Sequence, residues 1–246
     1  MESTEATNPK AYARLTGACY LGLGVAGIFG GFLAIAAQVV PGDPVATAQN
    51  LALNGGMVRA GILAWMLTLV LDVVVAWGLY VLTRPADTRL SVLMAWLRLV
   101  YVAVHAGAAA NLARALRYAE GGGHLEAFGT DQLAALASDA LLAHRTGFEI
   151  ALLFFGLHLG LLAVLLWRSG FMPKLIAALL CASSAAYLVN AVAFLGLATY
   201  DRYAALLLGL VSVLAIVAEL ALAGYLLAVG IRTEPWLRAD EKRRTA

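Results

Sequence analysis

The segment LTLVLDVVVAWGLY, residues 67–80, contains one charged side chain, Asp72, in an otherwise apolar run. The run continues on both sides, and an α-helix needs about 20 such residues to cross the roughly 30 Å of hydrocarbon in a bilayer. The whole chain of 246 residues is 62% hydrophobic and 13% charged, with a mean hydropathy of +0.84. Soluble domains have about 25% charged residues. These features predict an all-α, polytopic membrane helix bundle.

Six apolar segments predict six transmembrane helices. They cover about residues 12–38, 57–83, 90–117, 141–167, 173–196 and 204–230. The first is not typical of a cleaved signal peptide, because the preceding MESTEATNPK is acidic and the apolar run is too long for a signal core. The fourth and fifth spans are separated by RSGFMPK, in which Pro173 and two flanking charges favour a turn.

The connections between the spans differ in charge. Basic side chains gather in the N-terminal segment, the second and fourth connections and the C-terminal tail, whereas the other connections carry acidic ones. The positive-inside rule therefore predicts that both termini lie in the cytoplasm, with the bundle in a bacterial inner membrane. The expected organisation is a cytoplasmic N-terminal segment (1–11), a six-helix transmembrane domain (12–230) and a basic cytoplasmic tail (231–246) against anionic headgroups.

Two outer connections are long enough to contain short helices on the membrane surface. In residues 41–56, Asp43 is an expected N-cap, Pro44 is suited to the first helical position, and a Gly-Gly pair lies beyond the expected end. In residues 120–140, Thr130 follows a triglycine and can cap a helix that leads into the fourth span. These helices would form a lid over the bundle or serve only as connectors.

Two stretches resemble a known membrane family. They are GDPVATAQNLALNGGMVRAGILAWMLTLVLDVVVAWGLYVL, residues 42–82, and FFGLHLGLLAVLLWRSGFMP, residues 154–173. The chain resembles the bacterial membrane family filed as domain of unknown function 4386. Besides the outer-loop Gly-Asp, the positions that carry this resemblance are Arg59, Asp72, Tyr80, Arg98, Pro173, Tyr187 and Glu219. The resemblance implies a membrane-embedded fold and brings no activity with it.

Four ionisable side chains fall in one layer near the bilayer middle. Counted at about 1.5 Å per residue from the predicted cytoplasmic ends, Asp72 and Glu219 lie about 16 Å deep, and Arg98 and His158 about 13 Å deep. A charge that faces lipid at this depth costs several kcal/mol, so these groups are expected to turn inward and pair. Asp72 is the expected counter-ion of Arg98, with Glu219 competing for the same partner.

Two acids and one arginine leave a carboxyl without a full partner, which favours a site for a proton or a ligand. Helical phase adds further polar residues to this interior seam. The predicted ligand- or proton-binding residues are Asp72, Arg98, Glu219, His158, His105, Tyr101 and Asn190. The alternatives are an ion pair that only fixes helix register and a His158 that is a hydrogen-bonded core residue.

Arginines also occur at the outer ends of the second to fourth spans, where the positive-inside rule leaves few. These are Arg59, Arg114 and Arg145, and Glu149 lies one turn below Arg145. Because guanidinium groups suit carboxylate and phosphate, the cluster predicts an anion or lipid-headgroup site. The alternative is that the arginines snorkel or bind the acidic outer loops.

Enzyme and cofactor signatures are missing from the sequence. There is no His-Glu-x-x-His, no Gly-x-Ser-x-Gly and no glycine-rich phosphate loop, so no catalytic residue is assigned. Haem would need two histidines at one depth, but His105 and His158 differ by about 11 Å along the helical rise, and His144 lies higher still. Two cysteines alone cannot form a structural zinc site. No metal, cofactor or nucleic-acid partner is therefore expected.

A bundle with a polar interior favours binding or transport of a small molecule, a lipid or a proton. Its expected partners are the lipid bilayer and an anionic small molecule or lipid headgroup. A second hypothesis is an intramembrane enzyme that acts on a lipid, with Glu219 or Asp72 as acid and base. A third is a structural or assembly protein, because the glycine-rich first span contains Gly27-x-x-x-Gly31, which would permit an oligomer.

Overall fold

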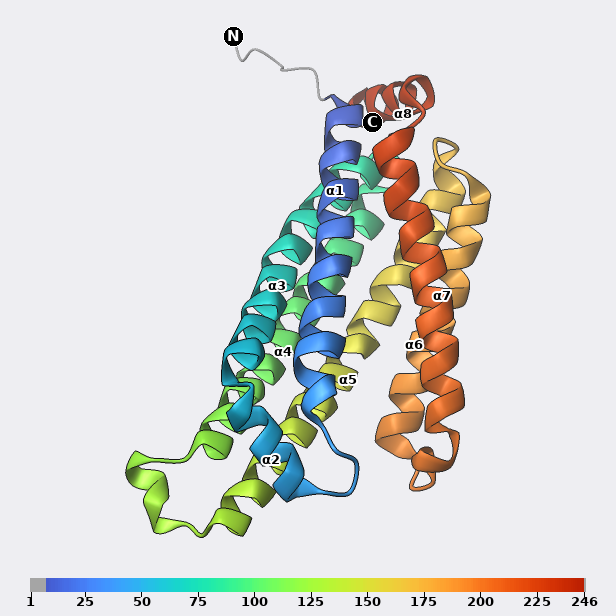
Figure 1. Cartoon of the computed structure of the whole chain (residues 1–246). Coiled ribbons are helices and arrows are strands. Elements are labelled where there is room, and N and C mark those ends of the chain that lie inside the picture. The colour runs from blue at the N-terminus through green and yellow to red at the C-terminus, as the bar shows by residue number, and fades with distance from the viewer. Residues whose placement is uncertain (1–7, 246) are drawn as a thin grey trace. The chain divides into compact units, whose positions relative to one another are not determined.

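The computed structural model describes residues 8–245, in which every regular element is a helix. The long helices are α1 (Pro9–Gly27), α3 (Gly55–Thr83), α4 (Thr88–Glu120), α5 (Thr130–Ser169), α6 (Lys174–Gly196) and α7 (Tyr200–Ala228), as Figure 1 shows. The shorter helices are α2 (Pro44–Leu53) and α8 (Thr233–Thr245). Most of the expected N-terminal segment, residues 1–7, lies outside the described residues.

Within residues 8–245, six helices are long and apolar enough to cross a membrane. The first of these includes a π-helical stretch (Ile28–Ile35) and a 3-10 turn (Ala36–Gln38) that continue α1. The other five are α3 to α7. This confirms the predicted all-α fold with six spans.

Helix α2 begins where its sequence predicts. The carboxylate of Asp43 accepts a hydrogen bond of 2.9 Å from the backbone N–H of Ala46, and Pro44 occupies the first helical position. The Gly-Gly pair that follows α2 already belongs to α3, because Asn54 alone separates the two helices.

The second outer connection leads into α5 without a break. Helix α5 begins at Thr130, well before residue 141, where the fourth span was predicted to start. The sequence between these positions contains neither glycine nor proline, so nothing ends the helix there. Only a 3-10 turn (Gly123–Ala127) remains separate from α4 and α5.

The C-terminal tail contains a helix, α8, that the sequence did not predict. Its Trp236 side chain is fully buried, and the indole N–H donates a hydrogen bond of 2.9 Å to the carbonyl oxygen of Leu82. A repeated apolar face is what reveals an amphipathic helix in a sequence. Helix α8 has mainly charged and polar residues around this one large buried side chain.

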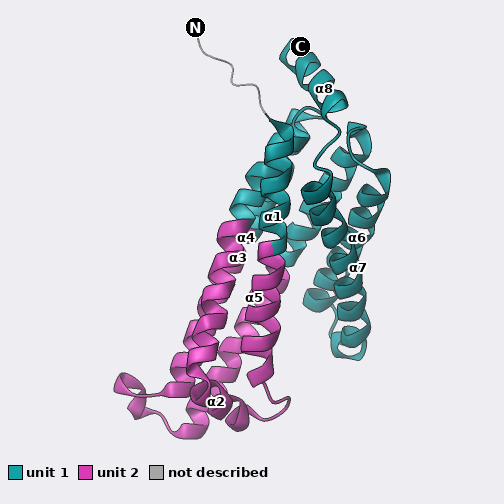
Figure 2. Cartoon of the chain, turned by 45° about the horizontal axis from the view of Figure 1, so that its top comes forward, with its two compact units in different colours: residues 1–21, 72–101, 152–246 teal, residues 22–71, 102–151 magenta. Residues whose placement is uncertain are grey.

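The chain divides into two compact units, which Figure 2 shows in different colours. Unit 1 comprises residues 1–21, 72–101 and 152–246, and unit 2 comprises residues 22–71 and 102–151. Helices α1, α3, α4 and α5 each contribute one part to either unit.

Close helix contacts hold unit 1 together. Helix α6 packs along α7. Helix α1 packs on α7 at Gly17, where a Cβ atom would lie 2.9 Å from the carbonyl oxygen of Ala223. Beyond the end of α7, Gly230 lies beside Lys10 at the beginning of α1. The start of α1 and the end of α7 therefore lie at the same end of unit 1.

Glycines allow a similar close approach in unit 2. A Cβ atom at Gly30 would lie 2.9 Å from the carbonyl oxygen of Gly61 on α3. Gly31 faces the ring of Trp65, also on α3. The glycine-rich surface of the first span therefore packs against α3 of the same chain.

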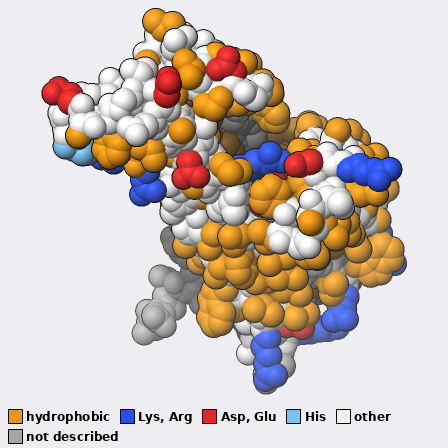
Figure 3. Space-filling view, turned by 90° about the horizontal axis from the view of Figure 1, so that it is seen from below, with side chains coloured by type: hydrophobic (Ala, Val, Ile, Leu, Met, Phe, Trp, Pro, Cys, Tyr) orange, Lys and Arg blue, Asp and Glu red, His pale blue; other side chains and the backbone are white. Residues whose placement is uncertain are grey.

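Much of the exposed surface is apolar. Val25 and Leu175 are each 70% exposed, and Leu206 is 71% exposed. Figure 3 shows broad hydrophobic areas with isolated charged side chains among them. Soluble monomers rarely expose contiguous apolar patches of large area, whereas helices in a membrane present such side chains to lipid tails.

Candidate functional site

Arg98, on α4, is the centre of a buried polar cluster in unit 1. Its side chain is fully buried, and Asp72 on α3 is only 2% exposed. The Nε–H of Arg98 donates to Oδ1 of Asp72 at 2.9 Å. A terminal nitrogen of the same guanidinium donates to the same oxygen. The structure therefore brings together the two residues whose charges offset each other.

The other side of the guanidinium has neutral partners. Arg98 donates hydrogen bonds to the hydroxyl of Tyr20 at 2.7 Å and to Nε2 of His158 at 3.0 Å. A guanidinium only donates, so Nε2 of His158 accepts, and Nδ1–H donates to the carbonyl of Met94 at 2.9 Å. Both ring nitrogens of His158 are thus occupied, which leaves neither for a ligand.

Aromatic rings enclose this charge. The guanidinium carbon of Arg98 lies 4.8 Å from the ring centroid of Tyr20 and 5.2 Å from that of Phe155. Phe155 also contacts the rings of Tyr101 and Tyr187, at 4.9 and 5.3 Å between centroids. Cations are attracted to such ring faces, most strongly where water is excluded. Arg98 therefore has a hydrogen-bonding and an aromatic environment that suits a permanent charge.

Glu219, on α7, has a different environment within unit 1. Its carboxyl is hydrogen-bonded to the hydroxyl of Tyr187 on α6. Among residues 8–245, Glu219 forms no ion pair. The ion pair of Arg98 is with Asp72. Asp72, and not Glu219, is thus the acid that pairs with Arg98. The partner of Glu219 is the neutral hydroxyl of Tyr187.

The remaining predicted seam residues lie in different surroundings. Tyr101 is buried in unit 1 and packs on Phe155. Asn190 accepts a hydrogen bond of 3.0 Å from the hydroxyl of Tyr200, which joins α6 to the first residue of α7. His105 belongs to unit 2.

In unit 2, His105 packs in an aromatic cluster. Its ring centroid lies 4.7 Å from Trp65, 4.6 Å from Phe148 and 6.2 Å from His144. His144 contacts the carbonyl oxygen of Ala108 at 3.1 Å. His144 therefore lies beside the turn of α4 that follows His105.

The described residues contain no group of three or more His, Cys, Asp or Glu side chains that could hold a metal ion. The His105–His144 pair supplies two imidazoles, whereas catalytic zinc sites use three protein ligands.

The four outer-rim residues also lie in unit 2. Arg59 forms an ion pair of 2.7 Å with Glu120, the last residue of α4. Arg114 donates to Asn111 of its own helix at 2.7 Å. The Ala108–His144 contact places Arg145 near the level of Ala108, about 9 Å along α4 from Arg114. The arginines are therefore spread along the helices, and Glu149 is buried.

Two hydrogen-bonding partners were missed by sequence reasoning. Tyr20 carries one of the contacts to Arg98, and Tyr187 carries the contact to Glu219. Both are neutral, so counting charges could not reveal them. The signal available was the occurrence of tyrosines inside apolar spans, where a hydroxyl needs a hydrogen-bonding partner.

Six membrane-spanning-capable helices, with a buried Arg–carboxylate pair in unit 1, define a multi-pass helical membrane protein. The sequence profile of the family described as domain of unknown function (DUF4386) matches residues 15–230. The chain belongs to this family, which confirms the resemblance noted from its sequence.

An uncharacterized protein of Archaeoglobus fulgidus is also similar to this chain. The two are 31% identical over 124 residues, which cover 50% of this chain and 60% of the archaeal protein. The chain thus spans well under two thirds of the length of that relative. No solved structure matches the chain.

Proposed function

We propose that the protein binds protons inside the membrane at Glu219 and couples this to the binding or transport of a small molecule. The observation that carries the proposal is the difference between the partners of two acids in the spans, the buried Asp72 and the partly buried Glu219. Asp72 has the Arg98 guanidinium, whereas Glu219 has the hydroxyl of Tyr187.

The partners of Arg98 support this division of roles. Its guanidinium donates to Asp72, Tyr20 and His158, so it is already well supplied with acceptors. Removing one member of such a pair would strand a buried charge. The Asp72–Arg98 pair therefore serves as a fixed structural element, and the variable charge lies elsewhere.

Glu219 has the position and surroundings of a group that gains and loses a proton. It lies about 14 Å along α7 from the end at Ala228, within the apolar part of the span. A carboxylate at that depth needs a cation or several donors, and one phenol supplies a single hydrogen bond. Intramembrane acids of this kind occur in proton relays and substrate pathways.

The proposed location is a bacterial inner membrane with both termini in the cytoplasm. Basic residues lie at the end of unit 1 where α1 begins and α7 ends, among them Lys10, Arg84, Lys174 and Arg232. A cytoplasmic position for this end follows from the positive-inside rule. Proton binding at Glu219 would then be driven from either side of the membrane.

Infrared difference spectroscopy of the purified protein during a pH titration tests the proposal. Wild type should show a protonated-carboxyl C=O band that disappears as pH rises, and Glu219→Gln should lack it. Asp201→Asn is the matched control, because Asp201 is an exposed acid in the first turn of the same helix. A titrating band that persists in Glu219→Gln would overturn the assignment.

Coupling is tested separately in proteoliposomes. An imposed pH gradient should drive dye-reported proton movement in wild type and Asp201→Asn, and Glu219→Gln should reduce it to the level of empty vesicles. Equal proton movement with Glu219→Gln would exclude Glu219 from the pathway.

A further inference from the structure

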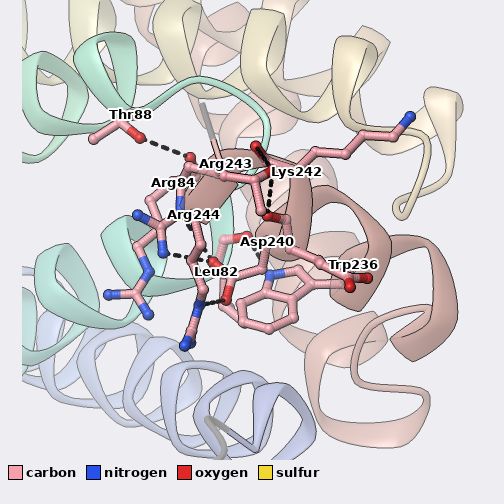
Figure 4. A network of polar contacts seen from close by, with 10 residues as sticks. Leu82, Arg84, Thr88, Trp236, Asp240, Lys242, Arg243 and Arg244 are labelled. Carbon is pink, nitrogen blue, oxygen red and sulfur yellow. Dashed lines mark hydrogen bonds and ion pairs between the residues drawn. The ribbon is translucent and has the colours of Figure 1, made fainter. Parts of the chain in front are cut away.

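The turn between α3 and α4 and the helix α8 border an open cavity in unit 1. Its volume is about 330 Å³. The lining residues are Arg84, Pro85, Ala86, Asp87, Thr88, Ala239, Lys242 and Arg243. Figure 4 shows this region, with Lys242 extending outward from α8. The cavity is separate from Glu219 and has no role in proton binding there.

The charge of the cavity suits an anion. Three lining residues are basic, and Asp87 is the one acid among them. One oxygen of Asp87 already accepts a hydrogen bond of 3.0 Å from the backbone N–H of Leu90. Asp240, which does not line the cavity, is bound by Arg243 at 2.8 Å. The lining therefore retains an excess of positive charge.

Arg84 has an unfilled hydrogen-bonding position at this site. Its Nε atom is buried and has no hydrogen-bond partner among residues 8–245. A buried donor without an acceptor is costly, and a charged donor more so. An anion in the cavity would supply the acceptor. Guanidinium groups bind phosphate oxygens particularly well.

An apolar groove lies along the same α3–α4 hairpin. Its volume is about 250 Å³, and it is lined by Val73, Ala76, Trp77, Tyr80, Val92, Ala95, Trp96 and Leu99. Ala76 and Ala95 are 2% and 9% exposed and form its floor, whereas Trp77 and Trp96 are 48% and 62% exposed. The groove is therefore open, with two exposed indole rings in its lining.

Helical periodicity aligns the groove with the cavity. On α3 the groove residues Val73, Trp77 and Tyr80 continue to Arg84 in steps of three or four. On α4 the same spacing leads from Thr88 through Val92 to Leu99. Residues at these spacings share one face of a helix. Cavity and groove thus follow one another along one face of the hairpin.

We propose that this face binds an anionic phospholipid, with the phosphate in the cavity beside Arg84 and one acyl chain in the groove. From Arg84 to Val73 the distance along α3 is about 16 Å, close to half of the roughly 30 Å hydrocarbon thickness. Cavity and groove together therefore extend over about the depth of one leaflet. A soluble phosphate would fill the cavity alone and leave the groove without an occupant.

Native mass spectrometry of the full-length protein in mild detergent tests this inference. With equal phosphatidylglycerol and phosphatidylcholine, wild type should retain phosphatidylglycerol preferentially. Arg84→Gln and Lys242→Gln should each weaken its retention by about tenfold or more, because each removes a charge-assisted contact. Arg238→Gln is the matched control, since Arg238 lies on α8, outside the lining, with its side chain 77% exposed. Equal retention of the two lipids would overturn the proposal, as would wild-type retention in both charge variants.

A second arm separates a lipid from a soluble phosphate. Ala95→Phe places a ring in the floor of the groove and should reduce phosphatidylglycerol retention while every charge remains. Glycerol phosphate at the same concentration should not displace the lipid. If Ala95→Phe retains the lipid as wild type does, or glycerol phosphate displaces it, the groove holds no acyl chain and the lipid assignment fails.

Discussion

The indole N–H of Trp236 donates to the main-chain carbonyl of Leu82 across a distance of 2.9 Å. Leu82 lies in the last turn of α3, where carbonyl groups have no partner within the helix. One side chain therefore satisfies the end of a span and anchors α8. The anchor makes α8 part of unit 1 rather than a free tail.

Trp236→Ala should release α8 from unit 1. Truncating a buried aromatic side chain costs about 3–5 kcal/mol, which exceeds what the remaining contacts of a short charged helix can supply. Trypsin should then cleave at Arg238 and Lys242 much faster than in wild type. Leu237→Ala is the control, because Leu237 is 48% exposed. Equal cleavage rates in wild type and Trp236→Ala would show that other contacts hold α8.

Asp72→Asn and Arg98→Gln should each lower stability by about 3–5 kcal/mol, because each leaves the other member of a buried pair without its counter-ion. The double variant should recover part of this loss. Thermal unfolding in detergent and the yield of folded protein are the measurements. Additive losses in the double variant would contradict direct coupling, and three silent variants would indicate a solvated cluster.

The ion pairs of Asp240 with Arg243 and Arg244 on α8 should persist at neutral pH and break only in acid. Burial raises the pKa of Asp240, but hydrogen bonds from Arg243 and Arg244 outweigh it and hold the pKa below its usual range. Because the pKa of Asp240 is lower in the folded protein, its ionised carboxylate stabilises the folded state at pH values above the unfolded pKa of about 3.9. This stabilisation is lost as the pH falls through the folded-state pKa.

A spin label at Leu237→Cys, with both native cysteines replaced, reports this behaviour. The label should keep one mobility from neutral pH to about pH 4 and become more mobile below it. Asp240→Asn should show the mobile spectrum at neutral pH. Increased mobility between pH 5 and 7 in the wild-type background would assign the switch to another group.

Gly30→Ala should destabilise unit 2 by about 1–3 kcal/mol, because the added methyl meets the carbonyl oxygen of Gly61 at 2.9 Å. Gly24→Ala is the matched control, since a Cβ atom there meets nothing within 4 Å. The melting temperatures of both variants in detergent give the comparison. Equal melting temperatures would show that the two helices separate without cost.

Reporter fusions test the proposed orientation. A reporter that works only in the cytoplasm should be active after Ala246 and silent when inserted at Gly122, which lies between α4 and α5. A periplasmic reporter should give the opposite pattern. The predicted spans α5, α6 and α7 lie between the two positions, so the positions should be on opposite sides of the membrane. Activity of the cytoplasmic reporter at both positions would contradict this.

Sequence reasoning was strongest where a single physical rule dominates. Apolar runs of membrane-spanning length predicted the six spans, and the cost of a charge in hydrocarbon made the pairing of Asp72 with Arg98 predictable. The N-cap of α2 was equally accessible, because Asp43 and Pro44 act within one turn.

Other features depend on contacts that leave no local pattern. A helix capped by Thr130 was predicted, but the fourth span was placed from residue 141 because the first turns of α5 are of mixed polarity and lack an apolar run. Neutral partners such as Tyr20 carry no charge to count. The docking of α8 depends on Trp236, a single large buried residue in a mainly charged helix, and the neighbourhood of His105 and His144 depends on how α4 and α5 pack.

The contacts of Arg98 also set an order of events during synthesis. Tyr20 and Asp72 precede Arg98 by 78 and 26 residues, and His158 follows it by 60. Chains emerge from the ribosome N-terminus first. When α4 reaches the bilayer, the acid that neutralises its arginine is therefore already made, and only the imidazole arrives later. The fully buried Arg98 thus never has to enter the membrane before its counter-ion.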